Sequence, residues 1–126
     1  MISGIGIDMC SISRIQSILD REGKDGAFFR RAFSLSEQQE AEKRHDLAAF
    51  YAARFAVKEA VFKAVAPLTP KGFDLRIVES AHKQDGSPYV LINKSLQACM
   101  DEAGIQKLHL SVTTEGDYAA AFVVAE

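Results

Sequence analysis

The residue types needed to bind a phosphate ester through a metal ion occur in two separate parts of the chain. Asp8 follows a short apolar stretch near the N-terminus, and Glu59 lies in a long alanine-rich stretch that also contains Lys63. Mg²⁺ prefers oxygen ligands, usually one or two carboxylates completed by phosphate oxygens and water. The pattern therefore predicts a magnesium site formed by Asp8 and Glu59.

Four cations close to these carboxylates in the sequence would hold the remaining phosphate oxygens: Arg14, Arg54, Lys58 and Lys63. Each carboxylate also has a structural alternative. Asp8 can cap the helix that follows it, and Glu59 can form a salt bridge with Lys63, four residues later, on a core helix. Spacing alone leaves these alternatives open.

The element that must position Glu59 is a helix predicted from Asp46 to Ala66. The stretch contains no Gly or Pro, Asp46 can cap its start, and Pro67 ends it. One stripe of this helix carries Glu59 among apolar and aromatic side chains: Tyr51, Phe55, Phe62 and Ala66. A second row of small residues allows another backbone or a ligand to approach closely: Ala56, Ala60 and Ala64.

The element that must position Asp8 is a strand predicted over Ile2 to Met9, with its end at Asp8. Gly4 and Gly6 alternate with isoleucines there, which indicates close approach of a backbone or a ligand. A helix capped by Ser11 or Ser13 and running to about Glu22 is predicted next. It presents Arg14 and Arg21 on one face, with Lys24 just beyond.

The remaining elements complete an α+β fold with a mainly antiparallel sheet packed against the long helix. Gly72 and two prolines predict a loop, and a strand (Phe73 to Glu79) and an Asp85-Gly86 hairpin to Tyr89–Ile92 are expected after it. A helix from Lys94 to Ala103 and two final strands follow, of which the last is expected to be a buried central strand or, as the less favoured alternative, a subunit contact. Capping boxes at Ser34–Glu37 and Ser36–Gln39 predict a short helix before the long one.

Length and composition predict a single domain covering residues 1–126. The chain has 48% hydrophobic residues, 25% charged residues and a formal net charge of −2. These values argue against a general nucleic-acid binder, and no apolar run is long enough to span a membrane. Cys10 and Cys99 lack metal-ligand spacing and are expected to be small buried side chains in a reducing cytoplasm.

Two motifs resemble those of the holo-acyl-carrier-protein synthases, the short stand-alone group of 4′-phosphopantetheinyl transferases: G-I-G-I-D at residues 4–8 and R-F-A-V-K-E-A-V-F-K-A at residues 54–64. Phe33-Ser34 with Glu37, the Asp85–Pro88 hairpin and the closing Tyr118–Ala121 are also similar to the family. The resemblance covers nearly the whole chain.

The resemblance implies the 4′-phosphopantetheinyl transferase fold and a Mg²⁺-dependent transfer of 4′-phosphopantetheine from coenzyme A to a serine of an apo-acyl carrier protein. The other product is 3′,5′-ADP. By the same resemblance, Asp8 and Glu59 would bind the metal, and Glu59 would accept the serine proton directly or through a metal-bound water. Lys63 would stabilise charge on the leaving phosphate, and Arg54 and Lys58 would contact coenzyme A phosphates.

The resemblance also implies partners and an assembly. The acidic carrier protein would dock on the basic face formed by Arg14 and Arg21, with Lys24 a further candidate. The family is typically a homotrimer. In it, the metal-binding carboxylates come from one subunit and part of the coenzyme A pocket comes from the next.

The chain departs from the family pattern at two places near coenzyme A. Ala66–Pro70 replaces a glycine-rich stretch, and Thr114 occupies the position of a family histidine. Because Thr cannot carry charge, coenzyme A binding is expected to weaken by about 1.5–3 kcal/mol unless another cation compensates. His45 and His82 are expected to be loop residues. These departures leave an alternative function, a non-catalytic paralogue that binds a carrier protein or coenzyme A without transfer.

Overall fold

The computed structural model describes residues 1–71 and 73–126, so Gly72, which the sequence analysis placed in a loop, lies outside the described residues. The elements follow in the order β1 (Gly4–Ser11), α1 (Ile12–Glu22), α2 (Ala27–Ala32), α3 (Leu35–Ala41), α4 (Leu47–Val65), η1 (Ala66–Leu68), η2 (Leu75–Ile77), β2 (Glu79–His82), β3 (Pro88–Leu91), α5 (Lys94–Ala103), β4 (Leu108–Glu115) and β5 (Tyr118–Ala125).

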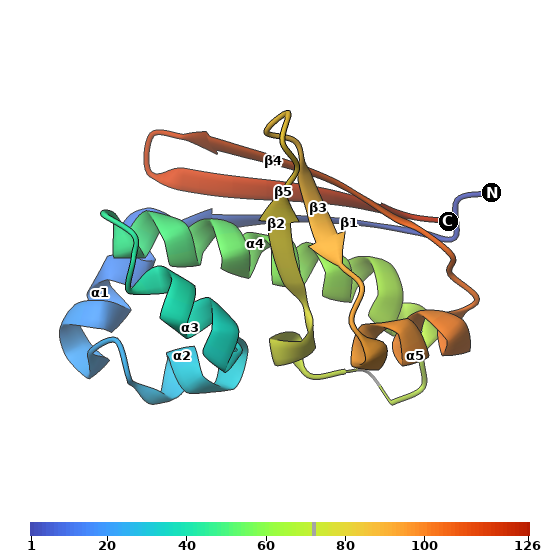
Figure 1. Ribbon diagram of the computed structural model, residues 1–126, viewed down its shortest axis with the longest axis horizontal. Coiled ribbons are helices and arrows are strands. Elements are labelled where there is room, and N and C mark those ends of the chain that lie inside the picture. The colour runs from blue at the N-terminus through green and yellow to red at the C-terminus, as the bar shows by residue number, and fades with distance from the viewer. Residues whose placement is uncertain (72) are drawn as a thin grey trace.

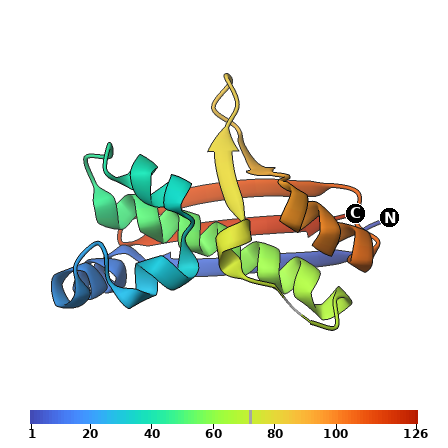
Figure 2. The same ribbon diagram turned by 60° about the horizontal axis from the view of Figure 1, so that its bottom comes forward.

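The fold is α+β, as predicted. Strands β1, β5 and β4 form an antiparallel sheet in that order, so the C-terminal strand is central, and β2 and β3 form a separate antiparallel hairpin. The helices lie on one side of the three-stranded sheet, with α4 along it (Figure 1). The β2–β3 hairpin projects away from the rest of the molecule (Figure 2).

Helix α4 lies unusually close to β1 because β1 has glycines at the contact. A Cβ atom on Gly6 would lie 1.9 Å from the Ala60 carbonyl oxygen, and one on Gly4 would lie 2.2 Å from the Ala64 carbonyl oxygen. Ala60 and Ala64 are themselves buried on the helix side of this contact. The predicted close approach of a backbone to both the glycines and the alanine row is therefore confirmed.

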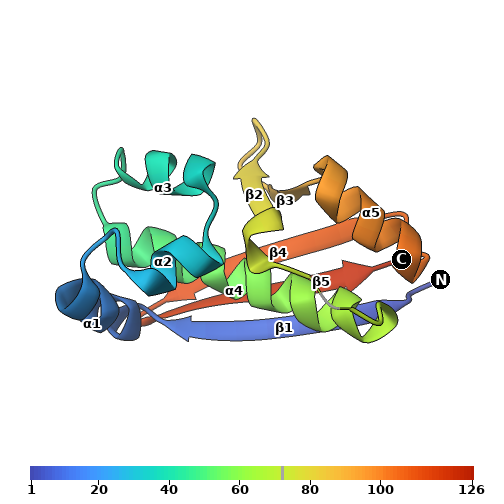
Figure 3. The ribbon, with the colours of Figure 1, turned by 90° about the horizontal axis from the view of Figure 1, so that it is seen from below.

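Helix α4 begins and ends next to the residues predicted to bound it, Asp46 and Pro67. The Asp46 carboxylate accepts a hydrogen bond from the Ala49 amide at 3.0 Å, and the helix ends at Val65 before the turn that contains Pro67. Helices α1, α2 and α3 pack at its N-terminal end and α5 at its C-terminal end (Figure 3). Aromatic rings fill the space at the N-terminal end: Phe28, Phe29, Phe33, Tyr51 and Phe55.

Three local predictions were wrong. Strand β1 does not end at Asp8 but continues to Ser11, because residues 8–11 pair with the central strand β5. The stretch Phe73–Glu79 is not a strand; it contains the 3₁₀ turn η2, and β2 begins only at Glu79. His82 is the last residue of β2 and not a loop residue. As predicted, Cys10 is buried, whereas Cys99 is half-buried.

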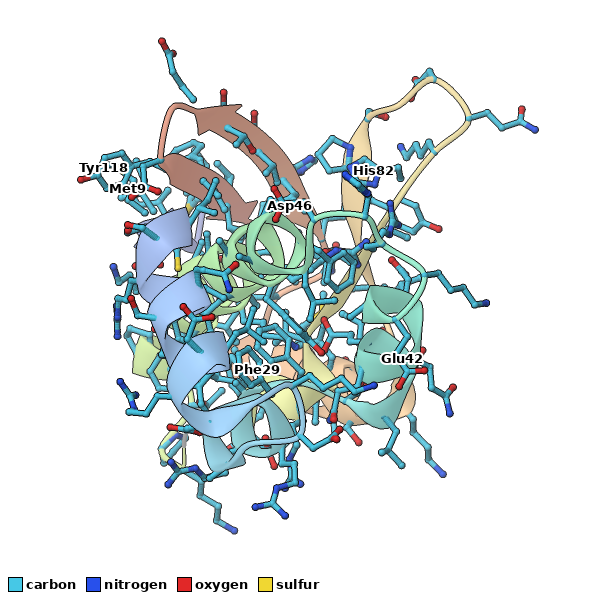
Figure 4. The ribbon with its side chains drawn as sticks, turned by 90° about the vertical axis from the view of Figure 1, so that its left-hand side faces the viewer. Met9, Phe29, Glu42, Asp46, His82 and Tyr118 are labelled. Atoms are coloured by element: carbon cyan, nitrogen blue, oxygen red, sulfur yellow. The ribbon has the colours of Figure 1, made fainter. Side chains whose placement is uncertain are left out.

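The sheet face that points away from the helices is apolar and exposed. The exposed fractions are 60% for Ile5, 63% for Ile7, 62% for Met9 and 42% for Phe122. Met9 and Tyr118 lie together on this outer side of the sheet (Figure 4). Neighbouring apolar side chains of this size are typical of a protein contact surface. Among the described residues, no helix is long and apolar enough to cross a membrane.

We expect Gly6→Ala to lower the free energy of unfolding by about 3 kcal/mol or more, because the new methyl group would overlap a backbone carbonyl that cannot move independently of α4. Urea unfolding measures the change. Ser3→Ala, at an exposed position just before β1, is the control and should stay within about 0.5 kcal/mol of the parent protein. Equal stability of both variants would contradict the close packing of α4 on β1.

Candidate active site

Asp8 lies within β1 on the face that packs against α4, and its side chain is only 18% exposed. The Lys63 ammonium donates to Asp8 Oδ1 at 3.1 Å and to the carbonyl oxygen of Ile7 at 2.9 Å. Asp8 is therefore not the cap of the following helix. That cap is Ser11, whose side-chain oxygen accepts from the Arg14 amide.

Glu59 is half-buried on α4, in the electrostatic field of the same groups. Burial raises the pKa of its carboxyl above the ordinary value of 4.5, and the Asp8 carboxylate raises it further. Lys63 and Arg14 act in the opposite direction. These four residues form what we call the carboxylate cluster. Lys63 makes its salt bridge with Asp8, so the alternative of a simple Glu59–Lys63 pair on α4 is not what the structure contains.

The carboxylate cluster has the donors that Mg²⁺ requires. It offers two hard carboxylates from two elements, and both are partly open to solvent. In the described part of the chain, no group of three or more His, Cys, Asp or Glu side chains is suited to hold a metal. Two carboxylates leave coordination positions for phosphate oxygens and water, which is the usual arrangement for Mg²⁺ at phosphate sites.

Arg14 reaches the carboxylate cluster from the first turn of α1. Asp117, in the β4–β5 turn, fixes the start of that helix by accepting from the Ser11 hydroxyl at 2.7 Å and from the Ser13 amide at 2.9 Å. This role of Asp117 could not be predicted, because nothing in the sequence spacing shows that the last turn of the chain meets the first helix. Arg21 is also exposed on α1.

Lys24, the third candidate for carrier-protein binding, is exposed just after α1. It pairs with Glu42 at 3.3 Å, so part of its charge is already neutralised. Arg21 has only a loose pairing with its neighbour Glu22, at 3.5 Å. The structure therefore places all three predicted cations on the surface, with Arg14 nearest to Glu59 and Lys24 the least available.

A second feature is a cavity of about 330 Å³ between α4, the β2–β3 hairpin and β4, which we call the hairpin cavity. Its lining includes two of the predicted coenzyme A contacts, Arg54 and Thr114. His82 lines it as well (Figure 4). An imidazole therefore lies in the same cavity as Thr114, which the sequence analysis could not know because it placed His82 in a loop.

Helix α4 separates the two features within one chain. An α-helix turns about 100° per residue, so Arg54 and Glu59 point about 140° apart. Lys63 reaches the edge strand β1, whereas Arg54 reaches the carbonyl oxygen of Ser80 in the hairpin. Thr114 lies on β4, the opposite edge strand. The predicted site residues thus form two groups on two flanks of α4.

The prediction that Lys58 contacts a phosphate of coenzyme A was wrong. Lys58 is completely buried, and its ammonium donates to Glu37 Oε1 at 2.6 Å and to the carbonyl oxygens of Leu75 at 3.0 Å and Val78 at 2.5 Å. An ammonium has three protons, and all three are used inside the protein. Desolvation by burial accordingly lowers the pKa of Lys58.

Comparison with known proteins finds similar sequences over nearly the whole chain. The model of the 4′-phosphopantetheinyl transferase superfamily matches residues 4–123. The chain is 38% identical over 125 residues to the holo-acyl-carrier-protein synthase of Myxococcus xanthus, with 99% of this chain and 95% of that protein covered. It is 35% identical over 130 residues to the corresponding protein of Caulobacter vibrioides, with 100% and 96% covered.

Solved structures are similar over the same extent. The holo-acyl-carrier-protein synthase of Neisseria meningitidis superposes with a TM-score of 0.86 at 34% identity, covering 100% of this chain and 99% of that chain. The Helicobacter pylori enzyme in complex with coenzyme A superposes with a TM-score of 0.75 at 28% identity, covering 97% and 99%.

We expect Glu59→Gln to stabilise the metal-free protein at about pH 8, because Gln carries no charge to desolvate and is not repelled by Asp8. The folded-state pKa of Glu59 is raised, so the folded protein holds this proton more tightly than the unfolded chain does. The free energy of unfolding therefore falls as the pH rises through the window that begins near 4.5.

Urea unfolding midpoints at about pH 8 and about pH 5 measure this effect, with a gain from the substitution at the higher pH that shrinks at the lower. Glu102→Gln, an exposed position on α5, is the control and should give no gain. A variant that is less stable than the parent at the higher pH would contradict the unfavourable environment assigned to Glu59.

Proposed function

The chain belongs to the 4′-phosphopantetheinyl transferase superfamily, and on that premise we propose that it is a holo-acyl-carrier-protein synthase. It transfers 4′-phosphopantetheine from coenzyme A to a serine hydroxyl of an apo-acyl carrier protein and releases 3′,5′-ADP. The observation that carries the proposal is the carboxylate cluster, in which Asp8, Glu59 and Lys63 meet although Asp8 is far from the other two in the sequence.

The reaction requires a proton acceptor and a group that stabilises negative charge. The serine oxygen forms a bond to the phosphorus that carries pantetheine, the bond from that phosphorus to the oxygen of 3′,5′-ADP breaks, and the serine proton goes to the Glu59 carboxylate. Glu59 is the acceptor because it is a partly exposed carboxylate beside Asp8 and Lys63, where the serine hydroxyl would be placed. The exposed Lys63 ammonium faces the same space and can stabilise charge on the departing phosphate.

Asp8 and Glu59 would hold Mg²⁺, which supplies neutralisation of the charge on the coenzyme A diphosphate when bound. The fit rests on the two hard oxygen donors and on the repulsion between them, which a cation relieves. Lys63 partly neutralises Asp8 and would be available to a phosphate where a cation held Asp8.

The hairpin cavity would receive another part of coenzyme A. Arg54 provides a buried guanidinium, Thr114 a hydroxyl and His82 an imidazole. Since Thr114 cannot carry charge, Arg54 and His82 are the groups in this cavity that can offset the missing family histidine. Lys58 has no part in this contact.

The basic face of α1 would receive the acidic carrier protein. Arg14 and Arg21 are exposed there, and Arg14 also acts on the pKa of Glu59, so this face ends beside the proposed proton acceptor. A carrier protein bound to α1 would therefore have its serine close to Glu59, because the docking face and the proposed proton acceptor are adjacent. Lys24 makes a smaller contribution because it already pairs with Glu42.

The active enzyme would be a homotrimer with shared sites. Two features support this assembly. The outer face of the sheet exposes Ile5, Ile7 and Met9, which a neighbouring subunit would cover. The hairpin cavity and the carboxylate cluster lie on opposite flanks of α4, so a single coenzyme A molecule can contact both most simply when they come from two subunits.

The non-catalytic alternative is less favoured because the groups needed for transfer are present and close together. A binding protein has no requirement for two repelling carboxylates, and their arrangement lowers stability at neutral pH. A measurement of phosphopantetheine transfer distinguishes the synthase from the non-catalytic binding protein.

We expect the protein to modify apo-acyl carrier protein in the presence of coenzyme A and Mg²⁺, with one phosphopantetheine added per carrier. Intact-mass spectrometry measures the product. EDTA should abolish it, and Asp8→Ala or Glu59→Ala should lower the rate at least about 100-fold, because each removes a metal ligand. Asp101→Ala, an exposed carboxylate on α5, is the matched control and should retain the parent rate.

Two outcomes would contradict this proposal. Transfer at the parent rate by Asp8→Ala would contradict the proposal that Asp8 is a metal ligand. An absence of transfer to every carrier protein of the host, together with measurable binding of coenzyme A or carrier, would support the non-catalytic alternative.

We expect two inactive variants to restore activity when mixed, if the sites are shared. Asp8→Ala removes the metal ligand of one subunit, and Thr114→Trp fills the hairpin cavity. Random mixed trimers should recover about a quarter of the parent activity, because one combination in four has an intact cluster facing an intact cavity. Each variant alone is the control. Mixed trimers that form but recover no activity would contradict the shared site.

A further inference from the structure

Two cations on α4 and two carboxylates on α3 hold the chain segment that leads into the β2–β3 hairpin. On α4, Arg54 and Lys58 lie one turn apart, and on α3, Glu37 and Glu40 lie one turn apart. Lys58 pairs with Glu37 at 2.6 Å, and Arg54 pairs with Glu40 at 3.0 Å. The like charges on each helix are thus balanced across the contact between the helices.

Both cations also donate to backbone carbonyls of the same segment. Lys58 binds the carbonyl oxygens of Leu75 and Val78, and Arg54 binds that of Ser80. The amide of Asn93 donates to the carbonyl oxygen of Ile77 at 2.7 Å. Residues 75–80 are therefore held by side chains along most of their length, from α4 and from the start of α5.

This segment needs such partners because it is irregular. It contains the 3₁₀ turn η2 and the first residues of β2, so much of its backbone has no regular partner strand. Buried carbonyl oxygens without donors are costly, and a side chain that supplies the donor also fixes the position of the backbone. The cations of α4 thus connect α4 directly to the chain segment that leads into the hairpin.

The hairpin is one wall of the hairpin cavity, and α4 is another. Ser80 and His82 line the cavity from the hairpin, and Arg54 lines it from α4. A change in the distance between these walls changes the size of the cavity directly. Lys58 and Glu37 do not line the cavity, so they act on a ligand there through the residues that do line it.

We propose that Glu37 and Lys58 are positioning residues for coenzyme A: their buried ion pair fixes the hairpin against α4 and so sets the width of the cavity that receives the substrate. The proposal rests on the proposed function in one respect, the identity of the ligand. The pair explains why two like charges occur one turn apart on α4, an arrangement that an isolated helix disfavours.

The chemistry of Glu37 fits a role in holding other groups in place. Its Oε1 atom accepts from both the Lys58 ammonium and the Ser34 amide, so the same carboxylate caps α3 and binds α4. A buried ion pair contributes little to stability compared with apolar residues of equal size. The ion pair makes directional contacts to the start of α3, to α4 and, through Lys58, to residues 75–78.

The test uses Lys58→Met and Glu37→Gln in the otherwise complete protein. Lys58→Met keeps much of the side-chain volume and removes all three hydrogen bonds, and we expect the KM and the Kd for coenzyme A to rise about tenfold. Glu37→Gln keeps an acceptor for the Ser34 amide and weakens only the contact to Lys58, so about a threefold rise is expected. The kcat and the KM for carrier protein should stay within about twofold of the parent values.

Hydrogen exchange provides a readout that a general loss of stability would not reproduce. Amides of residues 79–82 and 89–91 should exchange faster in both variants, whereas amides of β1 and β5 should keep the parent rates. Arg76→Met is the matched control: it removes the exposed ion pair with Asp74 at the start of the same segment, and should alter neither coenzyme A binding nor exchange.

The outcomes separate this proposal from the proposed function. If the parent protein shows no transfer, the proposed function is wrong. Calorimetric binding of coenzyme A and hydrogen exchange still test the positioning role in that case. Folded variants with unchanged affinity for coenzyme A, or with faster exchange throughout the sheet, would overturn the positioning role. If Lys58→Met does not fold, Glu37→Gln decides the question.

Discussion

The close packing of α4 on β1 is the constraint on which the rest of the structure depends. Glycine at positions 4 and 6 lets the carbonyl groups of the helix reach the strand, and any side chain there would push the two apart. Asp8 is the next residue on the same face of β1, so the spacing that admits the helix also brings Lys63 to Asp8. The carboxylate cluster is thus a consequence of backbone packing.

The same helix has charged side chains with three different surroundings. Lys58 is fully enclosed and serves only the interior, Arg54 is buried but borders a cavity, and Glu59 and Lys63 face the edge at β1. This arrangement explains how one short motif can contain buried structural residues beside the residues that we propose to be catalytic. Adjacent positions on a helix point about 100° apart, so neighbours in the sequence need not share a function.

Much of the fold was predictable from local chemistry, and the site only in part. Asp46, Pro67 and Gly104 are strong helix signals, and the helices they bound were predicted closely. The strand expected at Phe73–Glu79 was wrong because alternation cannot show that the carbonyls of this segment are bound by side chains from α4. The role of Lys58 was wrong for the same reason: its partners come from α3 and from residues 75 and 78, which spacing within α4 does not reveal.

The energetic cost of the carboxylate cluster is itself informative about its role. A fold selected only for stability would replace one of two repelling carboxylates, since the metal-free protein loses free energy of unfolding as Glu59 ionises. Lys63 offsets part of this cost by binding Asp8, and its side chain is 51% exposed, so its ammonium is also open to a solvent-side partner. In the proposed function, a cation would neutralise the two carboxylates, and phosphate oxygens would be available to Lys63 and Arg14. On the proposed function, binding of the cation and of the substrate would therefore complete the arrangement of Asp8, Glu59 and Lys63.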